Sequence, residues 1–316
     1  MVLLVSETND ITTNEVVAWL NAYGATYQRI NNDAYARLHR VALSNTKCNI
    51  QVAGIDPSCL KKVWHRRGSL RFLPEPLRNV TNLYPYLKKE EDSILKSIED
   101  ILRGQHDYVG SYHKEIENYK IDHLINAKEA DLRIPDTLIT TSKKELIRFF
   151  NHHEGIITKD IRYGIKLHLE DGKLFSSGTF VVTQEMIDTM DTDFGPTLIQ
   201  EKIEKEYEIR IFFFKNRLYP MAILSQNDTK TAVDYRNYNR EKPNRNIPVL
   251  LPGEIKEKVL QFIELSELST GSIDIIVSKK GEYVFLEVNP QGQLDWVSKN
   301  CNYYIEKDIA EYLIAN

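Results

Sequence analysis

The sequence contains few of the features that would place a protein in a membrane, in a disulfide-stapled fold or around a zinc ion. Its 316 residues include only three cysteines, Cys48, Cys59 and Cys301, and no CxxC spacing. An odd number without paired spacing argues against a disulfide framework or a zinc site, and indicates reduced thiols in a cytoplasmic protein. No apolar run approaches the roughly 20 residues that span a bilayer. The apolar start meets the polar Glu7 and Asn9 too soon for a signal peptide.

The commonest nucleotide-binding and catalytic motifs are also missing. Neither GxxxxGK[ST] nor GxGxxG occurs, so P-loop and Rossmann nucleotide binding lack support. No histidine follows His168, which argues against a histidine-based triad or metal centre in the second half. The formal net charge of −4 gives no electrostatic case for nucleic-acid binding. A local basic stretch fits either a solvated rim or a patch that meets phosphate or an acidic substrate; it comprises Lys61, Lys62, His65, Arg66, Arg67 and Arg71.

The pattern of apolar residues changes from alternating helix and strand to a strand-rich second half. An apolar strand at 2–6, an amphipathic helix that carries Val16 and Leu20, and a strand at 26–30 predict an α/β layer. A helix marked by Ile94 to Leu102 ends this part, and further helices are expected within 118–137 and at 146–150. We therefore predict an α+β fold whose lobes enclose a cleft. Strands are expected at 155–159, 166–169, 179–182, 198–203, 207–214, 218–224, 272–277 and 283–289.

Two carboxylates near the C-terminal end are the most informative residues. If Ser278 pairs with Tyr283 across a turn at 279–282, Asp274 lies directly opposite Glu287, and Asn289 shares their face. Opposed carboxylates repel, and a divalent cation bound by these hard oxygens removes the repulsion. The alternative is an ordinary polar outer face of the hairpin. The core-facing set is expected to be Ile273, Ile275, Val284, Leu286 and Val288.

A second polar set lies upstream, where Glu208, Arg210 and Phe212 share one face of a strand. Glu208 is a candidate for ribose hydroxyls, and Arg210 for two-pronged binding of a transferring phosphoryl group. An ordinary ion pair on an exposed face is the alternative. Lys159 ends an apolar strand and is a candidate point charge on nucleotide phosphates, although such lysines are often only solvated.

The ordered spacing of these residues resembles the ATP-grasp superfamily over residues 115–316. Glu201 and Glu208 stand seven apart, Asp274 and Glu287 thirteen apart, and Asn289 follows by two, as in that superfamily. The resemblance implies ATP and Mg²⁺ as cofactors, with Asp274, Glu287 and Asn289 holding the metal. It implies that Lys120 and Lys159 contact ATP, that the backbone of Gln200, Glu201 and Ile203 binds adenine, and that Glu208 binds ribose.

Over nearly its whole length the chain resembles the graspetide (microviridin-type) synthetases, and among them the grasp-with-spasm peptide maturases. The matching stretches are "LLVSETNDITTNEVVAWLNAYG", "VWHRRG", "LRIPDTLIT", "YEIRIFFF", "VDYRNYN", "KPNRNIPVLLP", "TGSIDIIV" and "FLEVNPQGQ". The implied division is an N-terminal α/β domain (1–110, pre-ATP-grasp), a central lobe (111–195) and a C-terminal lobe (196–316). The implied activity is ATP-dependent macrocyclisation, in which Asp or Glu side chains of a ribosomal precursor peptide are activated and linked to Thr, Ser or Lys side chains.

The same resemblance implies a precursor with a leader segment, a homodimer, and a radical-SAM/SPASM partner. Candidate substrate contacts are Arg236, Arg245 and the acidic Asp188, Asp191 and Asp193, each of which is equally an ordinary surface residue. Two other functions stay open. One is a carboxylate–amine ligase that adds an amino acid or small amine to a protein or metabolite. The other is an inactive nucleotide-binding scaffold, against which the intact set of Lys159, Arg210, Asp274, Glu287 and Asn289 speaks.

Overall fold

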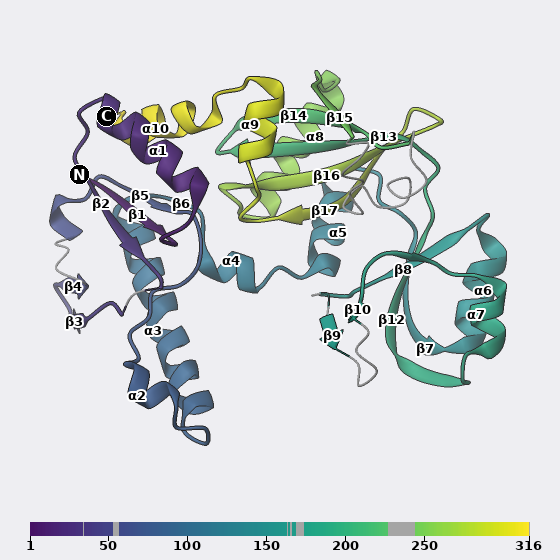
Figure 1. Cartoon of the computed structure of the whole chain (residues 1–316), viewed down its shortest axis with the longest axis horizontal. Coiled ribbons are helices and arrows are strands. Elements are labelled where there is room, and N and C mark those ends of the chain that lie inside the picture. Colours follow the sequence, from purple (N-terminus) through teal and green to yellow (C-terminus); the bar gives the residue numbers. More distant parts are fainter. Residues whose placement is uncertain are drawn as a thin grey trace.

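The computed structural model shows three main sheets, one after another along the chain (Figure 1). It describes residues 1–33, 35–52, 57–162, 164, 166–168, 174–226 and 244–315. The mixture of helices and strands confirms the expected α+β class. No helix of the described residues is long and apolar enough to cross a membrane.

The N-terminal sheet is parallel, with strand order β2-β1-β5-β6, and confirms the predicted α/β layer. Every residue of its central strand β1 is buried, as expected for a parallel strand covered on both faces. The N-cap Asp10 accepts a hydrogen bond from the Thr13 amide and so fixes the start of α1. The elements of this part are β1 (Val2–Ser6), α1 (Ile11–Ala22), β2 (Tyr27–Asn31), β3 (Leu38–Leu43), β4 (Cys48–Val52), η1 (Pro57–Cys59), β5 (Lys62–His65), α2 (Glu75–Arg78), α3 (Tyr84–Gln105) and β6 (Asp107–Val109).

The central sheet has the order β11-β8-β12-β7, and α6 and α7 lie against it (Figure 1). The Ser142 and Thr183 hydroxyls cap these two helices. β12 continues through the division expected at 195/196, and the three domain ranges stay a prediction. The elements here are α4 (Tyr112–Ile116), α5 (Lys120–Glu129), β7 (Thr137–Ser142), α6 (Lys143–His152), β8 (Ile156–Lys159), β9 (Lys166–His168), β10 (Leu174–Ser176), β11 (Phe180–Val181), α7 (Gln184–Thr189) and β12 (Asp193–Glu201).

The C-terminal sheet is antiparallel, with the order β15-β14-β13-β16-β17. One face of β13, carrying Ile209, Ile211 and Phe213, packs against α5 and α8 in a single apolar cluster. The other face carries Phe212 and contributes to the cluster shared with the N-terminal sheet. The elements are β13 (Lys205–Phe214), β14 (Arg217–Leu224), β15 (Arg245–Pro248), α8 (Gly253–Leu265), β16 (Thr270–Ser278), β17 (Tyr283–Asn289), α9 (Asp295–Cys301) and α10 (Ile305–Ile314).

The β16–β17 hairpin corrects one detail of the sequence prediction. Tyr283 pairs with Val277 and not with Ser278, whose amide instead bonds the Glu282 carbonyl. The turn therefore ends one residue earlier than predicted, at Gly281, whose φ is +82°. A bulge between the Asp274 and Ile275 rungs restores the expected register beyond it. As a result Phe285 faces Ile275 in the apolar cluster, and the expectation that Val284 and Leu286 lie on that face is wrong.

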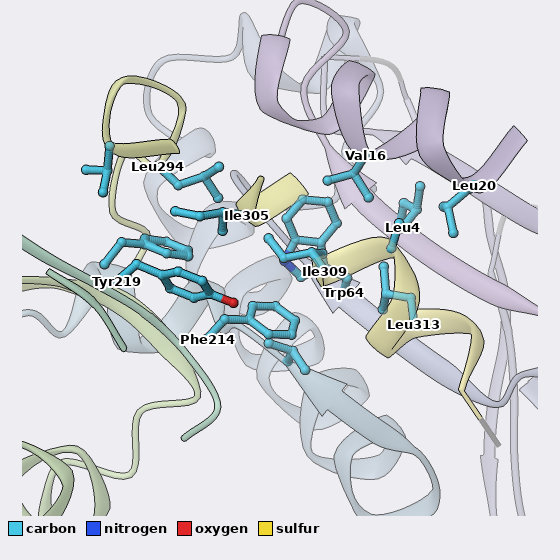
Figure 2. Packing of buried hydrophobic residues seen from close by; sticks show 14 of the residues in the cluster. Leu4, Val16, Leu20, Trp64, Phe214, Tyr219, Leu294, Ile305, Ile309 and Leu313 are labelled. Atoms are coloured by element: carbon cyan, nitrogen blue, oxygen red, sulfur yellow. The ribbon is translucent and has the colours of Figure 1, made fainter. Parts of the chain in front are cut away.

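A single apolar cluster joins the first and last parts of the chain (Figure 2). Side chains from β1, α1 and β5 contact α10 and the face of the C-terminal sheet that carries Phe212. They are almost fully buried there. Trp64 is 1% exposed and Ile309 is fully buried. The N-terminal and C-terminal sheets are thus fixed against each other by a packed core, and α1 lies directly on α10. The labelled members are Leu4, Val16, Leu20, Trp64, Phe214, Tyr219, Leu294, Ile305, Ile309 and Leu313.

We predict that Ile309→Ala destabilises the protein by about 2–5 kcal/mol, because it leaves a cavity where two sheets meet. The matched control is Ile314→Ala on the same helix, where the side chain is 39% exposed. Guanidinium unfolding of the three proteins measures the difference. Equal midpoints for Ile309→Ala and Ile314→Ala would show that the cluster does not stabilise the joint.

Candidate active site

Three charged side chains form a row across neighbouring strands of the C-terminal sheet. Arg210 of β13 faces Asp274 of β16, and Asp274 faces Glu287 of β17. The Arg210 Nη1 atom donates to both Asp274 oxygens, at 3.0 Å to Oδ1 and 2.7 Å to Oδ2. Both residues are 7% exposed. The predicted opposition of Asp274 and Glu287 is confirmed, and the alternative of an exposed ion pair is wrong for Arg210.

The row is held in place by its burial and by its neighbours. Removing one partner of a buried ion pair typically costs about 3–5 kcal/mol, because the other charge is left uncompensated. Glu287 adds a second negative charge opposite Asp274, and Lys120 Nζ lies 3.9 Å from Glu287 Oε2. Lys120 also donates to the Asp160 carbonyl at 2.8 Å, so it connects the end of β8 with the row. Two carboxylates are therefore kept close together by cations on either side.

The donor set fits Mg²⁺, with one qualification at Asn289. Asp274 and Glu287 supply hard carboxylate oxygens from adjacent strands, as magnesium prefers. Asn289 Oδ1 already accepts the amides of Gln291 and Gly292, each at 3.1 Å. Asn289 would therefore give up one of these bonds to bind a metal. Gly292 has a φ of +51°, and a Cβ there would lie 2.4 Å from the Ser272 hydroxyl, so the turn requires glycine.

The row opens into a cleft of about 780 Å³ between the N-terminal part and the C-terminal sheet. A cleft of this size is large enough for a small ligand or several side chains. Of the residues that the structure describes, three arginines and five carboxylates line it, together with amide side chains and Trp296. The charged lining residues are Arg66, Arg67, Arg210, Glu7, Asp10, Asp274, Glu287 and Asp295.

The residues expected on the nucleotide side lie on the central sheet and in the connection to β13. Lys159 ends β8, next to the Asp160 carbonyl that Lys120 binds, and pairs with Leu198 of β12. Gln200 is 1% exposed; its Nε2 donates to Thr137 Oγ1, and its Oε1 has no hydrogen-bond partner among the described residues. Ile203 is half-buried between β12 and β13. The structure thus groups these residues around one strand connection.

Both glutamates of this group are bound by nearby cations. Glu201 Oε1 accepts from Arg133 Nη2 at 2.9 Å and from the Asp136 amide at 3.0 Å. Glu208 is 5% exposed and accepts from Lys205 Nζ at 2.5 Å. Sequence reasoning missed Arg133 and Lys205. Lys205 and Glu208 are three residues apart on the extended strand β13. A bulge at the start of this strand brings their side chains together.

The substrate candidates are scattered. Arg236 lies outside the described residues, and Arg245 is exposed at the start of the edge strand β15, where its neighbours Asn244 and Asn246 line the cleft instead. The three acidic candidates are exposed around the end of α7 and the start of β12; Asp188 accepts from Gln184 Nε2 at 2.7 Å. Asp191 and Asp193 line a separate hollow of about 560 Å³.

One link between the two walls of the cleft was also missed. Arg66, from the basic stretch, is only 4% exposed and its Nη1 donates to the Gln291 carbonyl at 2.8 Å. The Gln291 side chain donates to Glu115. Burial raises the pKa of Glu115 to about 7, although Arg67 and Arg66 oppose the shift. The solvated-rim interpretation of the basic stretch therefore holds for the exposed Lys61 but is wrong for Arg66.

No known protein-family model matches the sequence, and no curated protein sequence is significantly similar to it. Solved structures match it over almost their whole length. A Chryseobacterium gregarium RiPP-associated ATP-grasp ligase, in complex with ADP and a leader and core peptide, has a TM-score of 0.83 and 24% identity, covering 99% of this chain and 96% of its own. The macrocyclase MdnC of Microcystis aeruginosa MRC, bound to the precursor peptide MdnA, has a TM-score of 0.77 and 25% identity, with 99% of both chains covered.

A third match is the ATP-grasp ligase PsnB, complexed with a minimal precursor, Mg and ADP; its TM-score is 0.77 at 17% identity, with 99% of this chain and 96% of that one covered. Each of the three structures contains a precursor or its leader and core, and each covers 99% of this chain. The chain therefore has the ATP-grasp fold of these RiPP-associated ligases and macrocyclases over almost all of its residues.

Proposed function

We propose that the protein is an ATP-dependent, ADP-forming peptide ligase that closes side-chain rings in a ribosomally made precursor. In this proposal an Asp or Glu side chain of the peptide is activated and linked to a Thr or Ser hydroxyl, as an ester, or to a Lys amine, as an amide. The observation that carries the proposal is the row of Arg210, Asp274 and Glu287, which opens into a cleft on a fold shared with precursor-bound ligases.

The residues on the nucleotide side support a role in holding ATP. Lys120 and Lys159 lie where the central sheet meets the charged row, and supply positive charge for the phosphates. The backbone of Gln200 and Glu201, at the end of β12, and of Ile203, in the connection to β13, would bind adenine. Glu208 would exchange its bond with Lys205 for the ribose hydroxyls. Asp274, Glu287 and Asn289 would hold Mg²⁺, which supplies charge neutralisation at the transferring phosphoryl group.

The proposed chemistry proceeds in two displacements. A carboxylate oxygen of the peptide attacks the γ-phosphorus of ATP, the bond to the bridging oxygen breaks, and ADP leaves. The hydroxyl or amine of the same peptide then attacks the acyl carbon, phosphate leaves, and the nucleophile loses one proton. In such reactions the protein contributes mainly positioning and electrostatic stabilisation. Arg210, held rigidly by Asp274, would stabilise the acyl phosphate and the tetrahedral intermediate.

Recognition of the precursor would extend beyond the cleft. The hollow beside α7 carries Asp191 and Asp193 at its rim, with Asp188 nearby, and its charge suits a basic leader segment. Arg245, and Arg236 in the segment that precedes β15, are candidate contacts for the acidic part of the peptide. We further propose that the protein is cytoplasmic, forms a homodimer and works with a radical-SAM/SPASM partner. The three free thiols are compatible with a cytoplasmic location.

We predict that a precursor peptide encoded in the same gene neighbourhood loses the mass of one water per link when incubated with the protein, ATP and Mg²⁺. Mass spectrometry measures the loss. Glu287→Gln abolishes it, because one metal-side carboxylate is gone. Glu264→Gln is the matched control on α8, where the side chain is exposed. An unchanged peptide, with ADP released only when small amines and carboxylates are added, would favour the carboxylate–amine ligase; no ADP release at all would favour the inactive scaffold.

We further predict that Arg210→Lys lowers kcat by about 10²–10³ while the protein stays folded, because lysine keeps the charge beside Asp274 but not the planar guanidinium. Arg217→Lys, at the exposed start of β14 where the side chain is 64% exposed, is the control. Coupled ADP-release kinetics and circular dichroism together test the assignment. Turnover of Arg210→Lys within twofold of the control would remove Arg210 from the chemistry.

A further inference from the structure

Two adjacent arginines form part of the cleft wall opposite the charged row. Arg66 and Arg67 follow directly after β5 of the N-terminal sheet, and both line the cleft. The Arg66 side chain is 4% exposed and the Arg67 side chain 33%. Neither belongs to the residues to which the proposed function gives a role in ATP, metal or phosphoryl binding. Their position is nevertheless tied to that site, because the Gln291 carbonyl that Arg66 binds is two residues from Asn289.

The arginines are near carboxylates but are not satisfied by them. Asp10 lies 3.9 Å from Arg66 Nε and 3.8 Å from Arg67 Nε, and Glu7 lies 3.8 Å from Arg67 Nη1. These separations exceed the roughly 2.7–3.2 Å of a direct hydrogen bond. Both Nε atoms are buried without a hydrogen-bond partner among the described residues.

Asp10 does not close this gap, and one of its oxygens is engaged elsewhere. Its Oδ1 accepts from both the Thr13 amide and the Thr13 hydroxyl, each at 2.7 Å, because it caps α1. Its other oxygen, Oδ2, lies 3.8 Å from Arg67 Nε, which is ion-pair distance but beyond a direct hydrogen bond. A buried donor without a hydrogen bond costs folding free energy, so natural proteins usually give such donors a partner. Two such donors that share one cleft wall indicate a position for an anion that arrives with the ligand.

The charge of the cleft favours a carboxylate over a phosphate as this anion. Among the described residues, five carboxylates and three arginines line the cleft, so this part of its lining is net negative. A singly charged group meets less repulsion there than a phosphate with more than one charge. The rest of the lining suits a peptide: Asn9, Asn244, Asn246 and Gln293 offer amides to a backbone, and Trp296 offers an apolar surface.

We propose that Arg66 and Arg67 form a subsite for a second carboxylate of the peptide substrate, distinct from the carboxylate that is activated beside Arg210. The ligase thereby selects peptides with acidic side chains in neighbouring positions. This inference rests on the proposed function, since it specifies the substrate class of the same cleft. Arg210 serves the reacting group and the arginine pair serves its neighbour, so one strongly charged region of the peptide is held at two points.

The binding test uses acetyl-Glu-Glu-amide, acetyl-Glu-Gln-amide and inorganic phosphate as probes in calorimetric titrations without ATP. The wild type is expected to bind the diacid about tenfold more tightly than the monoacid, as one charge-assisted hydrogen-bonded pair implies. Arg67→Gln is expected to abolish that preference, whereas Arg37→Gln, an exposed arginine of the same part that does not line the cleft, keeps it. Arg67→Lys retains the charge and is measured in its place should Arg67→Gln fail to fold; it too is expected to reduce the preference.

Equal binding of the two peptides to the wild type would overturn the proposal. So would a loss of phosphate binding in Arg67→Gln with the peptide preference intact, because the pair would then serve a phosphoryl group. In turnover, Arg67→Gln should raise KM for the precursor about tenfold at nearly constant kcat, and the increase should vanish for a precursor in which the neighbouring acid is replaced by Gln. A diacid preference without any mass loss in the precursor assay would instead contradict the proposed function and leave the subsite standing.

Discussion

The rest of the structure depends on placing three charges side by side within a largely buried sheet. Arg210, Asp274 and Glu287 occupy one rung across β13, β16 and β17. The next rungs on the same face carry Phe212, Ser272 and Asn289 on one side, and Glu208, Ile276 and Val284 on the other. Such a row is tolerated only where each charge has a partner and where the opposite face is a complete apolar core. The alternation of β13 meets both conditions, because Ile209 and Ile211 point into the cluster with α8 while Arg210 points away from it.

Much of this row could be predicted because strand alternation is local. A period of two fixes which of Glu208, Arg210 and Phe212 share a face, whatever the strand packs against. The opposition of Asp274 and Glu287 was also predicted correctly, but the pairing from which it was counted was not. The loop closes on Ser278 and Glu282, and the bulge near Leu286 then restores the register. Side chains alone do not reveal a bulge, so the apolar face was assigned wrongly at Val284 and Leu286.

The residues that sequence reasoning missed are those whose partners lie far along the chain. In sequence Arg66 resembles the other basic residues of its stretch, and only the docking of the C-terminal turn on β5 places it against Gln291, 225 residues later. The resemblance implied that Lys120 contacts ATP, but its link to Glu287 was not predicted, since nothing in the local pattern of α5 indicates it. The C-terminal helices that complete the shared apolar cluster were likewise not predicted, although they decide which surfaces of the first sheet are buried.

The way the three sheets are joined separates the two sides of the site. Leu4, Trp64 and Ile309 belong to one core that reaches from the first sheet to the last, so the wall with Arg66 and the row with Arg210 are held at a fixed separation. The central sheet has an apolar cluster of its own, built from Leu146, Ile156 and other residues of that part. Its side-chain links to the C-terminal sheet in the described residues are polar, such as Lys120 to Asp160 and Arg133 to Glu201 and Glu282. Polar links of this kind exchange partners at lower cost than a packed core does. The wall with Arg66 is therefore preorganised by packing against the row with Arg210, while the side toward the central sheet is arranged by charges, as the proposed exchange of partners with ATP and its metal requires.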